Sequence, residues 1–373
     1  MAETLLTMTL DELRTELTAL DTRILELIAE RQRLSGQVAA VKRATGRATR
    51  DFAREREVIL RARAQAEKLK FPPALAESVL RQLIDSSLAT QEQAGVAASG
   101  RGSGQRALII GGSGKMGGWF AEFLASQGFD VTLADPSPSA HGFARTPCWE
   151  DDPLEQELIV LATPLGITAQ VLTALAARRP RGLIFDLGSL KTPLRNGLAA
   201  VRAAGCRVTS LHPMFGPDTT LLSGRHVIFI DLGHAEALHE AQELFGPTMA
   251  ERVVMSLDEH DRLIAYVLGL SHALNIAFFT ALAGSGEAAP RLARMSSTTF
   301  DSQLEVASCV AQESPDLYYE IQSLNEYGGE SLEALHRSVQ RLVETVKARD
   351  AAGFKALMQQ GRAYLQGRAD AKT

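Results

Sequence analysis

An apolar residue recurs every three or four positions along residues 10–41, and Arg31 interrupts the series once. This spacing places the series on one face of a long helix, and such a face is buried against partner helices. A guanidinium keeps its charge, so Arg31 needs an anion inside the bundle. The anion is either a Glu or Asp of the protein or a carboxylate of a bound ligand. The series is Leu10, Leu13, Leu17, Leu20, Ile24, Leu27, Arg31, Leu34, Val38 and Val41.

Further basic residues gather beside this series. Arg14 and Lys42 each follow an apolar position of the helix, and a second basic cluster runs from Arg47 to Arg56. Cations at this density favour a ligand with more than one carboxylate, because ordinary surface charges alternate around a solvated face. We predict three helices, the last over residues 74–91. The first begins at a capping box at residues 9–12 and ends at a Thr-Gly pair at 45–46, and two prolines at 72–73 separate the second from the third.

These residues resemble the all-helical chorismate mutases over residues 5–92. The likeness rests on Leu13-Arg14, Ala29-Glu30-Arg31, Val41-Lys42, Arg50-Asp51, Arg54-Glu55-Arg56 and residues 85–91. The resemblance implies that the two carboxylates of chorismate bind Arg14, Arg31 and Arg54. It implies that Lys42 and Gln91 donate to the ether oxygen, and that the hydroxyl side is held by Asp51, Glu55 and Ser87. It also implies a dimer of interlaced protomers in which Arg14 of one protomer reaches into the active site of the other.

Composition predicts a larger, soluble, cytoplasmic protein. The chain has 373 residues, a net charge of -5 and 45% hydrophobic residues, which indicate two or three domains. It has no basic excess that would favour nucleic acid, and residues 1–3 lack the basic start of a signal peptide. Three cysteines, Cys148, Cys206 and Cys309, have no metal-binding spacing, so we expect no metal site and reduced thiols.

The segment Leu263–Ala283 contains no charged residue and is long enough to span a bilayer. Polar residues interrupt it, among them His272 and Asn275 on one face. We therefore expect no membrane span but a helix at the centre of a domain or of a dimer.

Residues 94–104 are mostly small, and we expect a flexible linker there, at a joint between two fused parts. A buried strand then follows at Ala107–Ile110, and after it come a glycine-rich turn and an amphipathic helix. In this context the glycines let the backbone approach a pyrophosphate at the helix N-terminus. The cofactor-binding residues expected in this turn are Gly112, Ser113, Gly114, Lys115, Met116 and Gly117.

Asp135 directly follows the next strand, Asp130–Ala134. A carboxylate here would bond the adenosine ribose and repel a 2′-phosphate, and no arginine follows before Arg145, so the sequence favours NAD over NADP. The alternative is that Asp135 only forms the turn before Pro136. Thr163, after the strand at 158–162, is a further expected cofactor contact.

More strand-like runs at 183–187, 208–211 and 227–230 alternate with helical stretches and predict a largely parallel, doubly wound sheet. His212 directly follows one of these strands and precedes Pro213. At the end of a strand such a histidine is a candidate base, although a lone loop histidine is usually a surface residue. Ser189 either orients the imidazole or the substrate, or caps a helix.

This region resembles the prephenate dehydrogenases of the type fused behind a chorismate mutase. The likeness runs from residue 107 to 264 and rests on the glycine-rich turn, residues 186–191, residues 211–218 and Glu259-His260-Asp261. It implies that NAD oxidises prephenate with loss of carbon dioxide, while His212 accepts the hydroxyl proton and Ser189 assists. It places Lys191 and His272 near the substrate, and His272 also in inhibition by tyrosine.

The chain departs from that family near Cys309, where the arginine expected for the ring carboxylate is missing. We expect Arg294, or else Arg291, to replace it. The departure leaves open whether arogenate is accepted.

The expected architecture is an N-terminal all-α bundle (1–93), a linker (94–105), a central α/β Rossmann-type domain (106–260) and a C-terminal all-α dimerisation domain (261–373). The expected function is conversion of chorismate to prephenate and then to 4-hydroxyphenylpyruvate by a homodimer. Two alternatives remain: a mutase fused to a dehydrogenase of another substrate, arogenate or a β-hydroxyacid, and a non-enzymatic sensor of NAD and metabolites.

Overall fold

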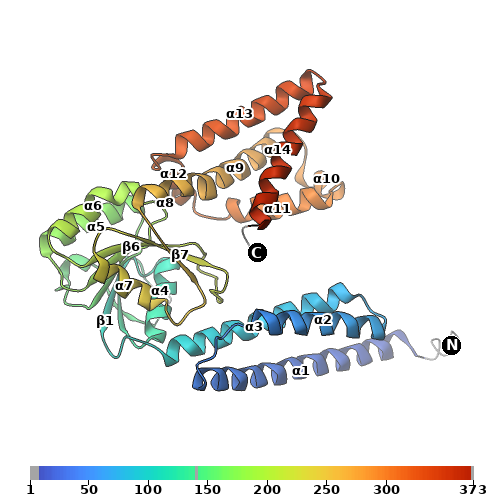
Figure 1. Ribbon diagram of the computed structural model, residues 1–373, viewed down its shortest axis with the longest axis horizontal. Helices are drawn as coiled ribbons and strands as arrows, with labels where there is room; N and C mark the ends of the chain where they lie inside the picture. The colour runs from blue at the N-terminus through green and yellow to red at the C-terminus, as the bar shows by residue number, and fades with distance from the viewer. Residues whose placement is uncertain (1–7, 139–141, 371–373) are drawn as a thin grey trace.

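The computed structural model describes residues 8–138 and 142–370, and side chains up to residue 367. Residues 1–3, considered above for a targeting signal, lie outside this part. The chain forms an N-terminal group of helices, a central sheet covered by helices on both faces, and a C-terminal group of helices. In Figure 1 the two outer groups extend from the α/β domain on the same side. The predicted fold class is confirmed.

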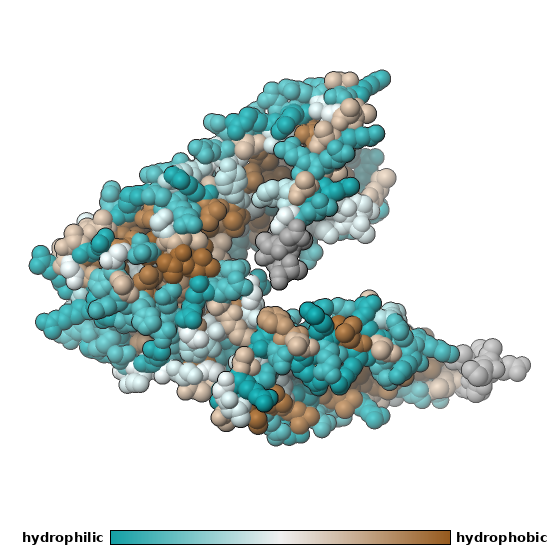
Figure 2. Space-filling model, in the orientation of Figure 1, coloured by the Kyte–Doolittle hydropathy of each residue, from teal (hydrophilic) through white to brown (hydrophobic). Residues whose placement is uncertain are grey.

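The N-terminal part consists of α1 (Leu10–Ala44), α2 (Phe52–Leu69) and α3 (Pro73–Ala98). The predicted capping box is present at the start of α1, where Thr9 and Glu12 bond each other's backbone amides. Helix α3 lies along α1 and α2, but the apolar series of α1 is exposed in the single chain; Leu20, for example, is 55% exposed. Apolar side chains are visible on the surface of this group in Figure 2. This face therefore has no cover within the described part of one protomer.

Within the described residues, eight strands form one sheet in the order β3-β2-β1-β4-β5-β6-β7-β8, and only the β6–β7 pair is antiparallel. The strand order reverses between β1 and β4, and in such sheets ligands bind at the carboxyl ends of the strands at this point. The strands are β1 (Arg106–Ile110), β2 (Asp130–Ala134), β3 (Ala144–Thr146), β4 (Leu158–Leu161), β5 (Leu183–Asp186), β6 (Val208–Pro213), β7 (His226–Ile230) and β8 (Glu251–Met255).

Helices cover both faces of the sheet, as the continuous apolar runs of its central strands require. On one face the core joins Ile109 to Phe120 of α4 (Lys115–Ser126) and to α7 (Ala235–Leu244). On the other face it joins Leu108 to α5 (Leu165–Arg178) and α6 (Arg195–Ala203).

The joint after the helical bundle differs from the flexible linker that we predicted. Helix α3 continues to Ala98, and Val96, 4% exposed, is part of the core around α4. Beyond the helix, Gly100 and Gly102 lie so close to the backbone of residues 127–128 that a Cβ on either would clash. Val96 and the backbone bonds from Gly102 N to the Gln127 carbonyl and from Gly104 N to the Gly128 carbonyl, both 2.9 Å, dock the segment, and the glycines permit this close approach.

The C-terminal part begins with one continuous helix made of α8 (Leu257–Ile264), a π-helical stretch (Ala265–Leu270) and α9 (Ser271–Gly284). The predicted boundary at 260/261 falls inside α8. By length and composition alone, this helix could cross a membrane, a test that core helices also pass. The remaining helices are α10 (Ala289–Arg294), α11 (Thr298–Ala311), α12 (Pro315–Ser323), α13 (Gly328–Lys347) and α14 (Ala351–Asp370).

Candidate active sites

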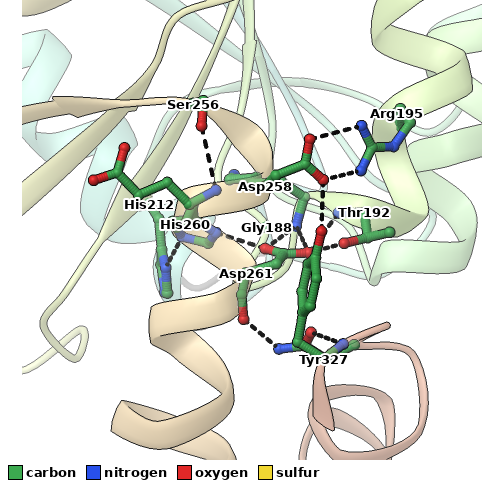
Figure 3. Close-up of polar contacts among 12 residues, drawn as sticks. Gly188, Thr192, Arg195, His212, Ser256, Asp258, His260, Asp261 and Tyr327 are labelled. Carbon is green, nitrogen blue, oxygen red and sulfur yellow. Dashed lines mark hydrogen bonds and ion pairs between the residues drawn. The ribbon is translucent and has the colours of Figure 1, made fainter.

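His212 lies inside β6, next to its last residue, and not in the loop after the strand as we expected. It is buried, and its Nδ1 lies 2.9 Å from Nε2 of His260. His260 Nδ1 in turn lies 2.6 Å from Oδ1 of Asp261. Both partners belong to the first turns of α8, so the start of this helix places a His–Asp pair behind His212 (Figure 3).

This chain of bonds fixes which nitrogen of His212 carries a proton. The Asp261 carboxylate accepts the proton of His260 Nδ1, so His260 Nε2 has a free lone pair and accepts from His212 Nδ1. His212 Nε2 is then the unprotonated nitrogen of the ring. Burial, aided by His260 and Lys191, holds the pKa of His212 well below its ordinary value of 6.5. The arrangement provides a neutral imidazole that can accept a proton.

Asp261 also receives the backbone amides of Lys191 and Thr192 and the Thr192 hydroxyl. Hydrogen bonds from His260, Thr192 and Lys191 lower the pKa of this carboxyl, although burial alone would raise it. Asn325, which precedes α13, donates to the Asp261 carbonyl at 2.9 Å. The carboxylate is thus charged, buried and bonded to His260 and to residues 191–192, while Asn325 holds the backbone of Asp261.

Lys191, which the resemblance placed near the substrate, turns its side chain into the protein interior. Its side chain is fully buried, and Nζ donates to Asp186 Oδ1 and to the Leu211 carbonyl, both at 2.7 Å. Burial lowers the pKa of Lys191, and the Asp186 carboxylate opposes that shift. Since the Leu211 carbonyl is next to His212, Lys191 supports the end of β6 from inside.

Ser189 is half-buried between β5 and the 3-10 turn Thr192–Leu194, at the same edge of the sheet as His212. It does not cap that turn, which has no side-chain cap bond. In the described part of the chain its hydroxyl makes no bond to His212, whose Nδ1 faces His260 instead. Ser189 therefore remains a candidate for a substrate contact and not for orienting the ring.

His272 lies in the first turn of α9, and its ring meets Tyr318 of α12 edge-on, with centroids 4.2 Å apart. Its Nδ1 is buried without a partner among the described residues, and burial lowers its pKa to about 4. Arg294, in contrast, is exposed at the end of α10, beyond the far end of α9 (Figure 1). The sequence prediction that Arg294 faces the ring carboxylate finds no support within one protomer, because α9 carries the chain about 20 Å away.

The glycine-rich turn has the backbone that a pyrophosphate needs. Gly111 has φ +86°, and a Cβ on Gly117 would lie 2.3 Å from the Gly111 carbonyl oxygen. Gly114 is the N-cap of α4 and supplies no side chain, so the first amides of this helix remain available to an anion. Lys115, next in the chain, is exposed and lies 3.9 Å from Glu313 of the C-terminal part.

Asp135 follows β2 and points its carboxylate at the turn, accepting from Ser113 N at 3.0 Å and from Ser137 N at 2.8 Å. The unpredicted strand β3 brings Arg145 beside it, where the guanidinium bonds the Asp135 carbonyl. An arginine is therefore closer than the sequence suggested. Thr163 lies at the end of β4, with its methyl group beside Gly111.

In the helical part, α1 and α3 face each other through polar contacts. Arg31 donates to the Leu83 carbonyl and to Ser87 Oγ, both at 2.8 Å, and Gln91 Nε2 donates to Ser35 Oγ at 2.8 Å. No protein carboxylate pairs with Arg31 within the described ranges, and partial burial lowers its pKa. The Gln91 Oε1 atom is buried and has no hydrogen-bond partner in the part of the chain that the structure describes. The anion that the sequence requires for Arg31 is thus not supplied by the described part of this chain.

The other predicted mutase residues are less completely assembled. Lys42 donates to the Thr49 carbonyl at 2.6 Å, and Asp51 caps α2. Glu55 forms a two-bond ion pair with Arg50. Arg54 is exposed and pairs with Glu57, while Arg14, with its side chain 67% exposed, lies 3.4 Å from Asp11.

Three sequence families match consecutive parts of the chain: chorismate mutase type II at residues 13–92, the prephenate dehydrogenase nucleotide-binding domain at 120–254, and the prephenate dehydrogenase dimerization domain at 256–360. The T-protein of Enterobacter agglomerans is 28% identical over 355 residues, covering 94% of this chain and 88% of that protein. The T-protein of Haemophilus influenzae is 29% identical, covering 70% of this chain and 67% of that protein.

Two solved structures share the fold of the dehydrogenase part. Prephenate dehydrogenase from A. aeolicus, in complex with hydroxyphenyl propionate and NAD+, has a TM-score of 0.55 at 19% identity and covers 72% of this chain and 98% of its own. Synechocystis arogenate dehydrogenase has a TM-score of 0.54 at 16% identity and covers 72% of this chain and 100% of its own.

Fold and site together define a nucleotide-dependent dehydrogenase that carries a helical mutase domain at its N-terminus. The chain belongs to the family of bifunctional chorismate mutase/prephenate dehydrogenases. Our site prediction omitted His260 and Asp261. The signal was present, since Glu259-His260-Asp261 was among the residues that carried the resemblance, but nothing in the sequence paired it with His212, 48 positions earlier.

Proposed function

We propose that His212 is the base of an NAD-dependent prephenate dehydrogenase, and that Arg31 and Lys42 belong to a chorismate mutase site in the same chain. The observation that carries the dehydrogenase assignment is the buried series His212, His260, Asp261, which leaves His212 Nε2 free to accept a proton. The carboxyl ends of the strands, where NAD and substrate meet in this fold, also carry Ser189 and the glycine-rich turn.

NAD+ supplies the hydride acceptor when it is bound at the glycine-rich turn. The residues of the chain do the rest. The amides at the start of α4 hold the pyrophosphate, and the Asp135 carboxylate bonds the ribose. His212 Nε2 takes the proton of the ring hydroxyl as the ring becomes aromatic and carbon dioxide leaves. Asp261, acting through His260, stabilises the imidazolium that forms on His212. Ser189 forms a hydrogen bond with the substrate.

In the mutase site, the rearrangement needs a compact conformer and donors at the breaking C–O bond, and no nucleophile. Arg31, together with Arg14 and Arg54, binds the two carboxylates. Lys42 and Gln91 donate to the ether oxygen, while Ser87, Asp51 and Glu55 hold the remaining polar groups. Arg14 reaches this site from a second protomer, which would also cover the exposed face of α1.

We place the enzyme in the cytoplasm as a homodimer with inhibition by tyrosine at the His272 side of the dehydrogenase site. A dimerization-domain match over residues 256–360 supports the homodimer. Arogenate is the second candidate substrate, because the chain lacks an arginine near Cys309 and shares its fold with an arogenate dehydrogenase.

One assay tests both activities. The purified chain is given chorismate and NAD+, and the absorbance of chorismate and of NADH is followed in the same cuvette. We expect chorismate loss first and NADH after it. Arogenate and NADP+ are tested in parallel. NADH formation from arogenate but not from prephenate would overturn the substrate assignment, and chorismate that stays unchanged would overturn the mutase assignment.

A further inference from the structure

The loop of residues 214–225 leaves β6 directly after Pro213 and returns as β7. It lies between two sites, because its Phe215 packs on Trp119 of α4, the helix that opens with the glycine-rich turn. Trp119 Nε1 also donates to the Thr219 carbonyl at 3.0 Å. The position of this loop therefore helps to set the space between His212 and the nucleotide helix.

Two further contacts hold the loop, and both come from the mutase domain. Glu92 of α3 is 4% exposed, and its carboxylate accepts from Leu222 N at 2.7 Å and from Met249 N. Burial raises the pKa of Glu92, and these two amides oppose the shift. A buried carboxylate with two backbone donors makes strong, directional bonds. Glu92 is also the residue directly after Gln91 of the mutase site.

Arg50 provides the second contact. Its Nη1 donates to Ser223 Oγ at 2.6 Å, while Nε and Nη2 bond Glu55 at 3.0 and 2.9 Å. The guanidinium also lies over the ring of Phe52, 4.5 Å from its centre. With its plane held by Glu55 and Phe52, the remaining edge of Arg50 is fixed toward the loop.

A cleft of about 880 Å³ separates α3 and α4 next to this loop and is lined in part by Thr90, Gln93, Trp119 and Thr220. This cleft lies beside the loop at Thr219 and Thr220, whereas Leu222, 4% exposed, belongs to the apolar core. Besides this apolar packing, directed contacts fix the loop: the Trp119 bond, the Glu92 carboxylate and the Arg50 guanidinium.

We propose that Glu92 and Arg50, although they belong to the mutase domain, are positioning residues for prephenate oxidation and act by holding loop 214–225 beside the substrate. This inference rests on the proposed function. The ring of His212 is fixed separately by His260 and by the pairing of β6 with β7. Loss of a loop contact should therefore raise KM for prephenate and leave kcat less changed.

Glu92→Gln is the first test, because an amide group has one acceptor and cannot receive both backbone N–H groups. We expect KM for prephenate to rise about tenfold, the range for a lost charge-assisted bond, with kcat within about threefold. Mutase kcat/KM should stay near the wild-type value and shows that the variant is folded. Glu67→Gln, which removes an exposed carboxylate of α2, is the matched control and should change neither activity.

Arg50→Ala, Ser223→Ala and the double variant form a second, independent test. If Arg50 acts through Ser223, the double variant should raise KM for prephenate no more than Arg50→Ala alone. Arg50→Lys, which keeps one donor nitrogen, should raise KM for prephenate less than Arg50→Ala does.

Three results would contradict the inference: an unchanged KM in Glu92→Gln, equal loss of both activities in that variant, or independent effects of Arg50→Ala and Ser223→Ala. Each of these results contradicts the inference when the wild-type chain oxidises prephenate in the same assay. A wild-type chain without that activity would overturn the proposed function itself.

Discussion

The side chains around His212 are buried and bonded to one another, whereas those around Arg31 bond mainly to backbone carbonyls and hydroxyl groups beside an exposed helix face. The proton acceptor is thus organised within one chain before any ligand arrives. The cations of the proposed mutase site are present, but neither an anion for Arg31 nor a cover for the apolar face of α1 comes from the residues that the structure describes. The comparison teaches that acid–base chemistry depends on a fixed internal network, while binding of a dianion can depend on a site completed by its ligand and by a second copy.

The largest effect is expected where the internal network meets the substrate. His212→Asn removes the proton acceptor and should lower kcat for prephenate oxidation about 1,000-fold, the range for loss of a general base. Chorismate mutase activity should be unchanged. Rates of NADH formation and of chorismate loss measure the two. A folded variant that loses both activities would contradict separate sites.

Arg31→Ala should have the next largest effect, now on the other site. It removes a charge that no carboxylate of the described residues neutralises, so mutase kcat/KM should fall about 100-fold while added prephenate is still oxidised. The Arg33→Ala variant, which changes a neighbouring residue of α1, is the control. If Arg31→Ala kept full mutase activity, the two sites would no longer differ as described.

Asp261→Asn tests how far the internal network matters. The amide can no longer accept from His260 and also keep all its other bonds, so the tautomer of His212 is no longer fixed, and kcat for prephenate should fall about 30-fold. The pH profile should change together with the rate. A lower thermal midpoint with an unchanged kcat would indicate that Asp261 only stabilises the fold.

Leu20→Glu tests the exposed face of α1. In a single chain this residue faces water, and the change would be nearly neutral. If a second copy covers it, the buried charge should lower mutase activity about tenfold and weaken association in analytical ultracentrifugation. Equal mutase activity and equal mass for variant and wild type would contradict the proposal that a second protomer completes the mutase site.

The smallest effect is expected from pH. Because the folded-state pKa of His212 lies below 6.5, the base stays neutral down to that pH, and kcat/KM for prephenate should fall only at lower pH. The unfolded chain binds more protons than the folded chain below pH 6.5, so the free energy of unfolding should also decrease there. Mutase activity is the internal control, because Arg31 keeps its charge throughout. A midpoint at or above pH 6.5 for prephenate oxidation would contradict the buried neutral ring.

Much of this architecture follows from local sequence. The central strands are apolar runs, the first helix has its capping box, and the glycines mark the nucleotide turn. Strands β3 and β8 escaped prediction because they lie at the edges of the sheet, where side chains are partly exposed and the apolar signal is weak.

The sequence singles out candidate site residues by type but does not show how they pair. It points to His212, Ser189 and the basic residues of α1, whose roles stay predictions, whereas the His212–His260 contact depends on how α8 packs against the end of the sheet. Lys191 has the right position in the chain for a substrate contact, yet its amine is turned inward to Asp186. Arg294 stays a prediction without support within one protomer, because the length of α9, which a sequence does not relate to the active site, carries it away.

The carboxylate of Glu92 binds two main-chain amides, and every amino acid except proline offers such an amide. Substitutions at position 249, and apolar ones at position 222 that still fill the core, therefore keep the contact, and no compensating exchange at position 92 would accompany them. Pairwise covariation among relatives would therefore miss this contact, although a proline at either position would remove one of its two N–H donors.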